Sequence, residues 1–324
     1  MLVLRDSVGG LEAAVAPAKG GEMASLRVRR GGEWVETLWL ARDYSPREGF
    51  GGKAPLLWPA VGRSRPADYK TEAAAGDSLP AGAWDWRGQR LPMPGHGFAR
   101  DLPWEVRAAV ADASGALVRL GLEDSAWTRE RYPFGYRLEV EYALEQGRLQ
   151  IRYFVRAKEG NRGAMPFSIG NHITFRTPLV EGSDPAQMTL IAPSAVELVK
   201  QEGVPTGEQR ARSHANGIPL GDFEVRNAVS LTGWEGDPWV ELRDPQGLAV
   251  RLEHRASKQP SQPSIQFNVW GDARDGYFSP EPWVGMQNSL NSGHGLIQLE
   301  PGEEFRWTVH VAFENIAASG AASR

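Results

Sequence analysis

The sequence of 324 residues contains no cysteine. This absence excludes disulfide bonds, thiolate catalysis and cysteine-ligated zinc, and it suits a reducing compartment. Long apolar runs are missing too, since none approaches the roughly 20 residues that a membrane helix needs. No run of lysine and arginine and no acidic tail accompanies the net charge of −4. We therefore expect a cytoplasmic protein that binds neither nucleic acid nor membrane.

Several motifs are absent as well. The first residues, MLVLRDSVGGLEAAV, lack the cationic start, apolar core and cleavage site of a signal peptide. No segment keeps a helical apolar period over about 12 residues, so long amphipathic helices are not expected. Glycine-rich phosphate loops, Gly-x-Ser-x-Gly and His-Glu-x-x-His are not found. We expect no metal or other cofactor.

Strand patterns dominate the chain. Residues 136–144 alternate apolar and polar side chains, and after Glu-Gln-Gly-Arg the alternation resumes over 149–155, which predicts an antiparallel hairpin. Residues 240–242 and 248–252 predict a second hairpin around Asp-Pro-Gln-Gly. Further strands are expected over 118–122 and 305–313.

These short strands, with 37 glycines and 23 prolines, are typical of an all-β fold, here a large antiparallel β-sandwich. We expect a single domain over 1–316 and a frayed tail over 317–324. The loop-rich stretch 42–90 is either functional or a disordered surface insertion.

Tryptophan is abundant, with twelve in the chain. Large aromatic side chains most simply fill a β core, but a few can line a groove and stack on the apolar C–H face of a sugar. The tryptophans beside proline or glycine include Trp58, Trp84, Trp86, Trp104, Trp234, Trp239, Trp270 and Trp283.

Two histidines lie in settings suited to proton transfer. His96 lies in MPGHGFAR, where glycine and proline predict a bend that can point the imidazole into a cleft. The alternative is a histidine in a surface loop. His172 lies in IGNHITF, where Asn171 can bond its ring or a substrate hydroxyl. The alternative there is a half-buried strand histidine whose ring is satisfied.

Glu281 is the matching carboxylate. It lies in SPEPWV, where a proline on each side holds the backbone extended. The neighbouring Trp283 can exclude solvent, which raises the pKa of a carboxyl group and makes it a better base near neutral pH. The alternative is an exposed loop glutamate.

Together these groups suit the interconversion of sugar anomers. The C1 hydroxyl must lose a proton while the ring oxygen gains one; the C1–O5 bond then breaks, C1–C2 rotates and the ring closes. A histidine with a pKa near 6.5 can donate the proton and a tuned carboxylate can accept one, each transfer being worth roughly 10²–10⁴-fold. No cofactor is required.

The segments around these residues resemble the aldose 1-epimerase, or galactose mutarotase, family. HGFARDLPWEV resembles its His-Gly-Phe-(Ala/Gly)-Arg motif, GNHITF its Asn-His-x-x-Phe motif, and FSPEPWVGMQNSL the segment with its catalytic glutamate. The resemblance implies that His172 is the general acid, Glu281 the base and His96 a substrate contact. GGKAPLLWPAVGR resembles a segment that ends in a substrate-binding arginine, here Arg63. By position, Trp283 would stack on the sugar.

One family feature is displaced. Many galactose-specific members have an aspartate before a phenylalanine, where this sequence reads FEVRNAVSL; Asp222 is the nearest replacement. A cationic rim would suit a phosphorylated sugar, as in the family's hexose-6-phosphate branch. The alternative is a solvated surface on which Arg100 pairs with Glu105. The candidate rim comprises Lys53, Arg63, Arg65 and Arg100.

We thus expect an aldose 1-epimerase-like isomerase, a monomer or homodimer, that acts on a monosaccharide or sugar phosphate. A carbohydrate-binding or sensor protein without turnover is the first rival, and an accessory domain of a lyase or hydrolase the second. A glycosidase would need a second acid. The available carboxylates, none singled out by the sequence, are Asp85, Asp222 and Glu241.

Overall fold

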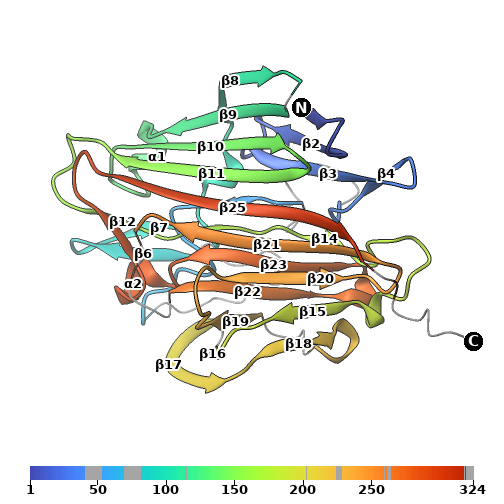
Figure 1. The fold of residues 1–324 in the computed structure, drawn as a ribbon. Helices are drawn as coiled ribbons and strands as arrows, with labels where there is room; N and C mark the ends of the chain where they lie inside the picture. The colour runs from blue at the N-terminus through green and yellow to red at the C-terminus, as the bar shows by residue number, and fades with distance from the viewer. Residues whose placement is uncertain are drawn as a thin grey trace, which may run out of the picture.

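The computed structural model describes residues 1–40, 53–68, 82–113, 115–201, 203–223, 228–258, 260, 264–316 and 318. Strands dominate the described residues, as predicted, and their sheets are antiparallel (Figure 1). About half of the loop-rich stretch, 42–52 and 69–81, and most of the expected tail lie outside the described residues. Neither α1, Ala126–Arg129, nor α2, Ser289–Ser292, is long enough to cross a membrane. These are the α-helices of the described part of the chain.

A nine-stranded sheet forms one layer of the sandwich. Its strand order is β18-β15-β20-β21-β25-β11-β10-β9-β8. The strands are β8 Glu105–Ala111, β9 Gly115–Glu123, β10 Tyr136–Glu145, β11 Arg148–Ala157, β15 Thr189–Ala192, β18 His214–Pro219, β20 Trp239–Arg243, β21 Leu248–Ala256 and β25 Glu304–Asn315.

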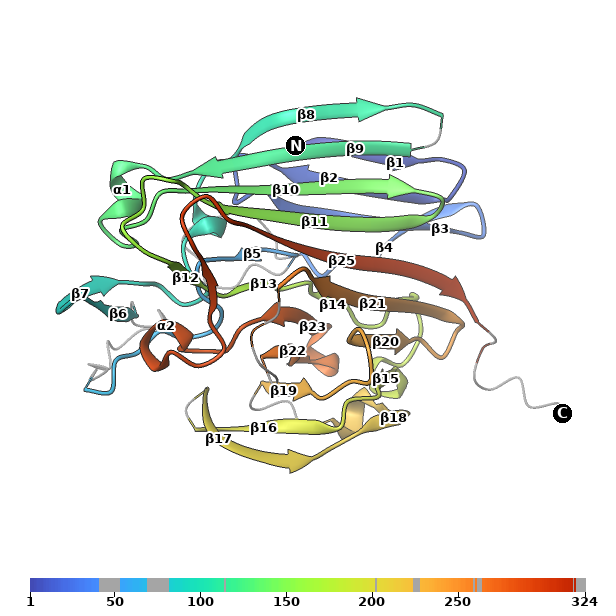
Figure 2. The ribbon, with the colours of Figure 1, turned by 60° about the vertical axis from the view of Figure 1, so that its left-hand side comes forward.

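An eight-stranded sheet forms the second layer, and its outer strands β16 and β17 lie at the bottom of the molecule in Figure 2. Its order is β17-β16-β19-β22-β23-β13-β5, and β14 also pairs with β23. The strands are β5 Leu56–Leu57, β13 Ile169–Asn171, β14 Phe175–Arg176, β16 Val196–Gln201, β17 Val204–Ala211, β19 Val229–Thr232, β22 Ile265–Asp272 and β23 Tyr277–Val284.

Smaller elements complete the sandwich. A four-stranded sheet near the N-terminus contains β1 Leu2–Asp6, β2 Leu11–Ala16, β3 Glu22–Arg30 and β4 Glu33–Glu36. Two-stranded sheets pair β6 Ala83–Trp86 with β7 Gln89–Pro92, and β12 Met165–Phe167 with β24 Ile297–Leu299. Short 3-10 turns are η1 Ala99–Asp101, η2 Pro185–Gln187, η3 Leu220–Asp222 and η4 Ala273–Asp275.

Both predicted hairpins are confirmed. In the first, β10 and β11 meet at a two-residue turn in which Gln146 and Gly147 both have positive φ, the geometry that matches strand twist. In the second, β20 pairs with β21, and the Gly247 N–H donates to the Asp244 carbonyl at 2.9 Å. The strands expected over 118–122 and 305–313 are β9 and β25.

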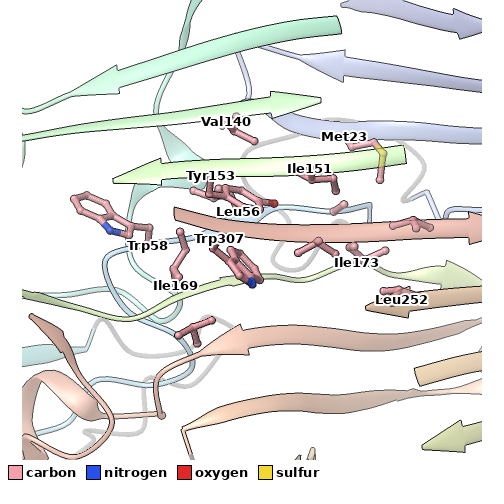
Figure 3. Packing of buried hydrophobic residues seen from close by; sticks show 14 of the residues in the cluster. Met23, Leu56, Trp58, Val140, Ile151, Tyr153, Ile169, Ile173, Leu252 and Trp307 are labelled. Carbon is pink, nitrogen blue, oxygen red and sulfur yellow. The ribbon is translucent and has the colours of Figure 1, made fainter. Parts of the chain in front are cut away.

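The core lies between the sheets and draws side chains from the nine-, eight- and four-stranded sheets. Because alternate residues of a strand face the same side, β11 buries every second side chain. Figure 3 shows Tyr153 of this row beside Trp307, and the two rings stack at 4.5 Å between centroids. Trp58 packs against Phe98, Tyr132 and other aromatic rings in the same core. Most of the buried tryptophans therefore fill the core.

Candidate active site

A row of polar side chains crosses the eight-stranded sheet. Ser230 on β19 is opposite Asn268 on β22, and Asn268 is opposite Glu281 on β23. Residues directly opposite in an antiparallel pair share a face of the sheet, so the three side chains are neighbours. The Asn268 amide donates to Glu281 Oε1 at 3.0 Å. Glu281 is only 1% exposed, which excludes the exposed-loop alternative.

His172 meets this carboxylate from the strand on the other side of β23. It directly follows β13, and its backbone N–H donates to the Pro55 carbonyl at 3.0 Å. Its Nε2 lies 3.4 Å from Glu281 Oε1, and its side chain is 7% exposed. The structure thus brings together the two residues for which the sequence predicts the acid and base roles.

Two hydroxyl groups set the tautomer of His172. The Thr174 hydroxyl donates to the His172 carbonyl at 3.1 Å and accepts from Ser279 Oγ at 2.9 Å. Because its proton is already used, Thr174 Oγ1 can only accept from His172 Nδ1, 3.3 Å away. We therefore assign the neutral ring's proton to Nδ1, which leaves the Nε2 lone pair facing Glu281.

His96 completes a second side of the site. Its φ of +66° confirms the predicted bend, and its backbone N–H donates to the Gly62 carbonyl at 2.7 Å. The Gly62 N–H donates in turn to His96 Nδ1 at 3.1 Å, so the neutral ring carries its proton on Nε2. The ring centroid lies 5.6 Å from that of His172 and 5.8 Å from that of Trp283.

Burial shifts the three pKa values toward the uncharged forms. It lowers the pKa of His172 to about 3, with a further contribution from the Arg100 charge. Burial, Arg100, His172 and Arg63 together hold the pKa of His96 well below its usual range. Burial raises the pKa of Glu281 well above its usual range, although Asn268, Lys200 and the Trp283 indole oppose that rise. The sequence-based expectation of a histidine that titrates near 6.5 is therefore wrong for His172, because the ring is desolvated.

Asn171 is placed differently from expectation, and Trp283 is buried. The Asn171 side chain is buried in the core, where it donates to the Tyr153 hydroxyl at 2.6 Å instead of bonding His172. Successive side chains of an extended chain face opposite ways, which accounts for the divergence of the two neighbours. Trp283 is 2% exposed, and a Cβ on Gly170 would lie 2.4 Å from its ring. Gly170 thus packs closely against the indole, and stacking of Trp283 on a sugar stays a prediction.

The other carboxylates proposed from the sequence do not join the pair. Asp222 is exposed on η3, and no hydrogen bond or ion pair among the described residues joins it to His172 or Glu281. Asp85 pairs with Arg90, and Glu241 with Arg243. Residues 224–227, within FEVRNAVSL, lie outside the described residues.

The four cations of the expected rim are not placed alike. Arg63 and Arg100 lie close enough to His96 to lower its pKa, while Arg100 also donates to the Gly95 carbonyl at 3.2 Å. Lys53 is buried, and its charge, with that of Arg100, acts on the half-buried Glu22. Arg65 is partly exposed. Glu105 pairs with Arg107, at 2.8 Å, and not with Arg100.

A lysine and two amides beside the pair were not predicted from the sequence. Lys200 on β16 donates to Asn268 Oδ1 at 3.1 Å, and Gln287 Nε2 donates to the same oxygen at 3.3 Å. Neither Lys200 nor Asn268 belongs to a recognisable motif, and only the strand register brings them beside Glu281. Trp270, whose ring centroid is 5.8 Å from that of His172, adds an aromatic wall. Among the described residues, no group of three histidine, aspartate or glutamate side chains is placed to hold a metal ion.

Comparison with known proteins gives the family. A family model described as aldose 1-epimerase matches residues 3–312. The chain belongs to the aldose 1-epimerase family. Over 97 residues it is 33% identical to a Salmonella typhimurium protein named "Putative glucose-6-phosphate 1-epimerase", a stretch that spans 28% of this chain and 33% of that protein.

Solved structures share the fold of this family member. The galactose mutarotase related enzyme from Lactobacillus acidophilus superposes with a TM-score of 0.76 at 20% identity, covering 100% of this chain and 99% of that one. Galactose 1-epimerase from Lactobacillus acidophilus NCFM superposes with a TM-score of 0.71 at 17% identity, covering 97% of this chain and 94% of that one. The predicted mutarotase-like antiparallel sandwich is thereby confirmed.

Proposed function

We propose that the protein is an aldose 1-epimerase that interconverts the α and β anomers of an aldose or aldose phosphate. The main support is the buried contact between His172 Nε2 and Glu281 Oε1, 3.4 Å apart, in a chain of this family. The two oxygens that exchange protons, O1 and O5, are both bonded to C1 of the sugar. Two groups this close together are suited to reach both oxygens from one side, through hydrogen bonds of about 2.8 Å.

The proposed reaction uses one mobile proton held by the pair. With the proton on His172 Nε2, Glu281 is a carboxylate that accepts the C1 hydroxyl proton. The electrons of that O–H bond form the aldehyde, the C1–O5 bond breaks, and O5 takes the proton from His172. After rotation about C1–C2, the same steps run in reverse and restore the pair. The proton count does not change over the cycle.

Substrate binding is expected to stabilise the charged forms of His172 and Glu281. Burial favours a neutral carboxyl and a neutral imidazole, whereas sugar hydroxyl groups placed between them can bond to both charged groups. His96 is proposed to donate from Nε2 to a sugar hydroxyl and Arg63 to bind a further oxygen of the substrate. A cysteine-free chain suits action in the cytoplasm, on a free monosaccharide or a sugar phosphate.

Polarimetry of freshly dissolved α-anomers tests the proposal. We expect the wild-type protein to accelerate the approach to anomeric equilibrium, and Glu281→Gln and His172→Asn each to lower kcat by at least about 10²-fold. Glu145→Gln, an exposed change on β10, should leave kcat unaltered. Sugar binding by calorimetry without acceleration by the wild-type protein would contradict the proposal and support a sugar sensor.

A further inference from the structure

We propose that Lys200 is a positioning residue for Glu281: its ammonium group holds the Asn268 amide in the orientation that donates to the carboxylate, and it favours the charged form of that carboxylate. This inference deepens the proposed function, on which it rests, by assigning a residue that acts through Asn268 and not on the sugar. It stands on a chain of hydrogen bonds that crosses the strands β16, β19, β22 and β23.

The strand register creates this chain. Leu198 is opposite Ser230, which is opposite Asn268, which is opposite Glu281. The pairing of β16 with β17 shifts register between Leu198 and Lys200, an irregularity of the kind that re-aims side chains. Lys200 Nζ lies 3.2 Å from Ser230 Oγ and 3.1 Å from Asn268 Oδ1. Asn268 then donates to Glu281 Oε1 at 3.0 Å.

Lys200 decides which way the Asn268 amide points. Ser230 Oγ, at 3.2 Å, and Gln287 Nε2, at 3.3 Å, also donate to Asn268 Oδ1. A hydroxyl can donate or accept and a side-chain amide can turn over, but an ammonium group can only donate. With Lys200 in place, a reversed Asn268 amide would set N–H groups against N–H groups and turn its oxygen toward the carboxylate. The observed orientation is therefore the one that the lysine enforces.

The charge of Lys200 also acts on the carboxylate. The charged groups that face Lys200 are Glu281 from β23 and Glu197 from its own strand, and Glu197 is already paired with Arg212 at 2.5 Å. Burial lowers the pKa of Lys200 to about 8, so the ammonium form prevails at neutral pH. The neutral His172 supplies no compensating charge before the proton moves. Lys200 is thus the cation that opposes the effect of burial on Glu281.

The test compares Lys200→Met with wild type in two measurements. In the pH profile of kcat/KM, the basic limb marks the loss of the one mobile proton from the pair. That limb should move to higher pH in the variant, because the Glu281 carboxylate loses a cation that lowers its pKa. When the midpoint of that limb rises by one pH unit, kcat/KM at a given pH on the limb rises about tenfold. Wild type should also lose activity above about pH 8, where Lys200 is deprotonated, and the variant should not show this loss.

The second measurement does not depend on turnover. The Glu281 carboxyl is titrated by ¹³C NMR of glutamate-labelled protein, with the signal assigned by its absence in Glu281→Gln. We expect a higher midpoint in Lys200→Met, partial recovery in Lys200→Arg, and no change in the surface variant Lys258→Met. Asn268→Leu removes the hydrogen bond to Glu281 at the other end of this series and should also raise the midpoint of the Glu281 titration.

An unchanged Glu281 midpoint in both folded variants, Lys200→Met and Asn268→Leu, would overturn the inference. Failure of the proposed function looks different, since wild type would then not accelerate anomer exchange whatever the carboxyl titration shows. A uniform loss of kcat at every pH, with the Glu281 midpoint unmoved, would also count against the inference, because it would indicate a merely structural lysine.

Discussion

At the scale of single residues, the site depends on close packing as well as on its titratable groups. Gly170 pairs with Trp283 across the sheet, and a Cβ at this position would lie 2.4 Å from the indole ring. Trp283 in turn contacts His96, with ring centroids 5.8 Å apart. A glycine two residues before His172 is therefore required by the ring that it faces and not by a turn.

Gly170→Ala tests this packing. The added methyl group must displace a buried indole, which should cost about 1–3 kcal/mol of stability. Because displacements near 1 Å at a catalytic site can cost about 10²-fold, we expect kcat/KM to fall by roughly 10–100-fold. Gly160→Ala, where a Cβ meets nothing within 4 Å, is the matched control. Wild-type kcat/KM in folded Gly170→Ala would show that Trp283 does not support the site.

Thr174→Val tests the tautomer of His172. The variant removes the acceptor at Nδ1 while nearly preserving side-chain volume. A hydrogen bond worth about 1 kcal/mol corresponds to roughly a five- to tenfold loss of kcat, with little change in KM. Thr177→Val removes another buried hydroxyl, which donates to the Ala273 carbonyl, and should leave kcat unchanged. Equal losses in both variants would indicate a general effect of buried hydroxyl groups.

The sequence predicted these residues unevenly. His96, His172 and Glu281 were identified because their types and neighbours suit acid–base chemistry, and the structure brings them together. Asn171 was assigned from adjacency, but neighbours on an extended chain face opposite sides. Lys200 could not be found in this way, since its place beside Asn268 depends on pairing between distant strands.

At the scale of elements, long alternating strands were predictable and short ones were not. β11, β21 and β25 each bury mainly alternate residues, so their sequences alternate. β5 and β13, which carry site residues beside them, are two and three residues long and fully buried. Too few residues remain in such strands for a period to be recognised.

Glu141 on β10 offers a test of how neighbouring strands are held. It is opposite Arg119 on β9 and Arg152 on β11, and its carboxylate bonds both, at 2.6 and 2.7 Å. Both arginine side chains are more than a third exposed, which weakens the ion pairs. We expect Glu141→Gln to lower the free energy of unfolding by about 1–2 kcal/mol, measured with urea. Glu145→Gln on the same strand should change it by less than about 0.5 kcal/mol.

At the scale of the whole molecule, buried histidines link stability to pH. His254 lies in the core, where its Nδ1 accepts from Trp307 Nε1 at 3.1 Å. Burial lowers its pKa to about 3, from an ordinary value of 6.5. The folded state therefore keeps the ring neutral while the unfolded chain protonates. The free energy of unfolding that depends on this neutral ring is fully present above pH 6.5. It is lost progressively as the pH falls toward 3.

His254→Gln should remove this part of the acid sensitivity while keeping an acceptor for Trp307. We expect the variant to have a lower free energy of unfolding than wild type at pH 7.5. Below pH 6, the difference between the two free energies should narrow by about 1 kcal/mol per pH unit. Urea unfolding at several pH values measures the difference. With His294→Gln, a change at an exposed position, the difference from wild type should stay constant. A constant difference for His254→Gln would mean that this ring does not set the acid sensitivity.

The proposed function depends on proton transfer by His172 and Glu281. Saturation transfer between the two anomeric protons measures ring opening and closing directly, at equilibrium, for glucose, galactose, pentoses and glucose 6-phosphate. We expect the wild-type protein to accelerate exchange for at least one of these sugars, and Glu281→Gln and His172→Asn to abolish that acceleration. Acceleration that survives in either folded variant would contradict proton transfer by His172 and Glu281, because catalysis would then not require the pair.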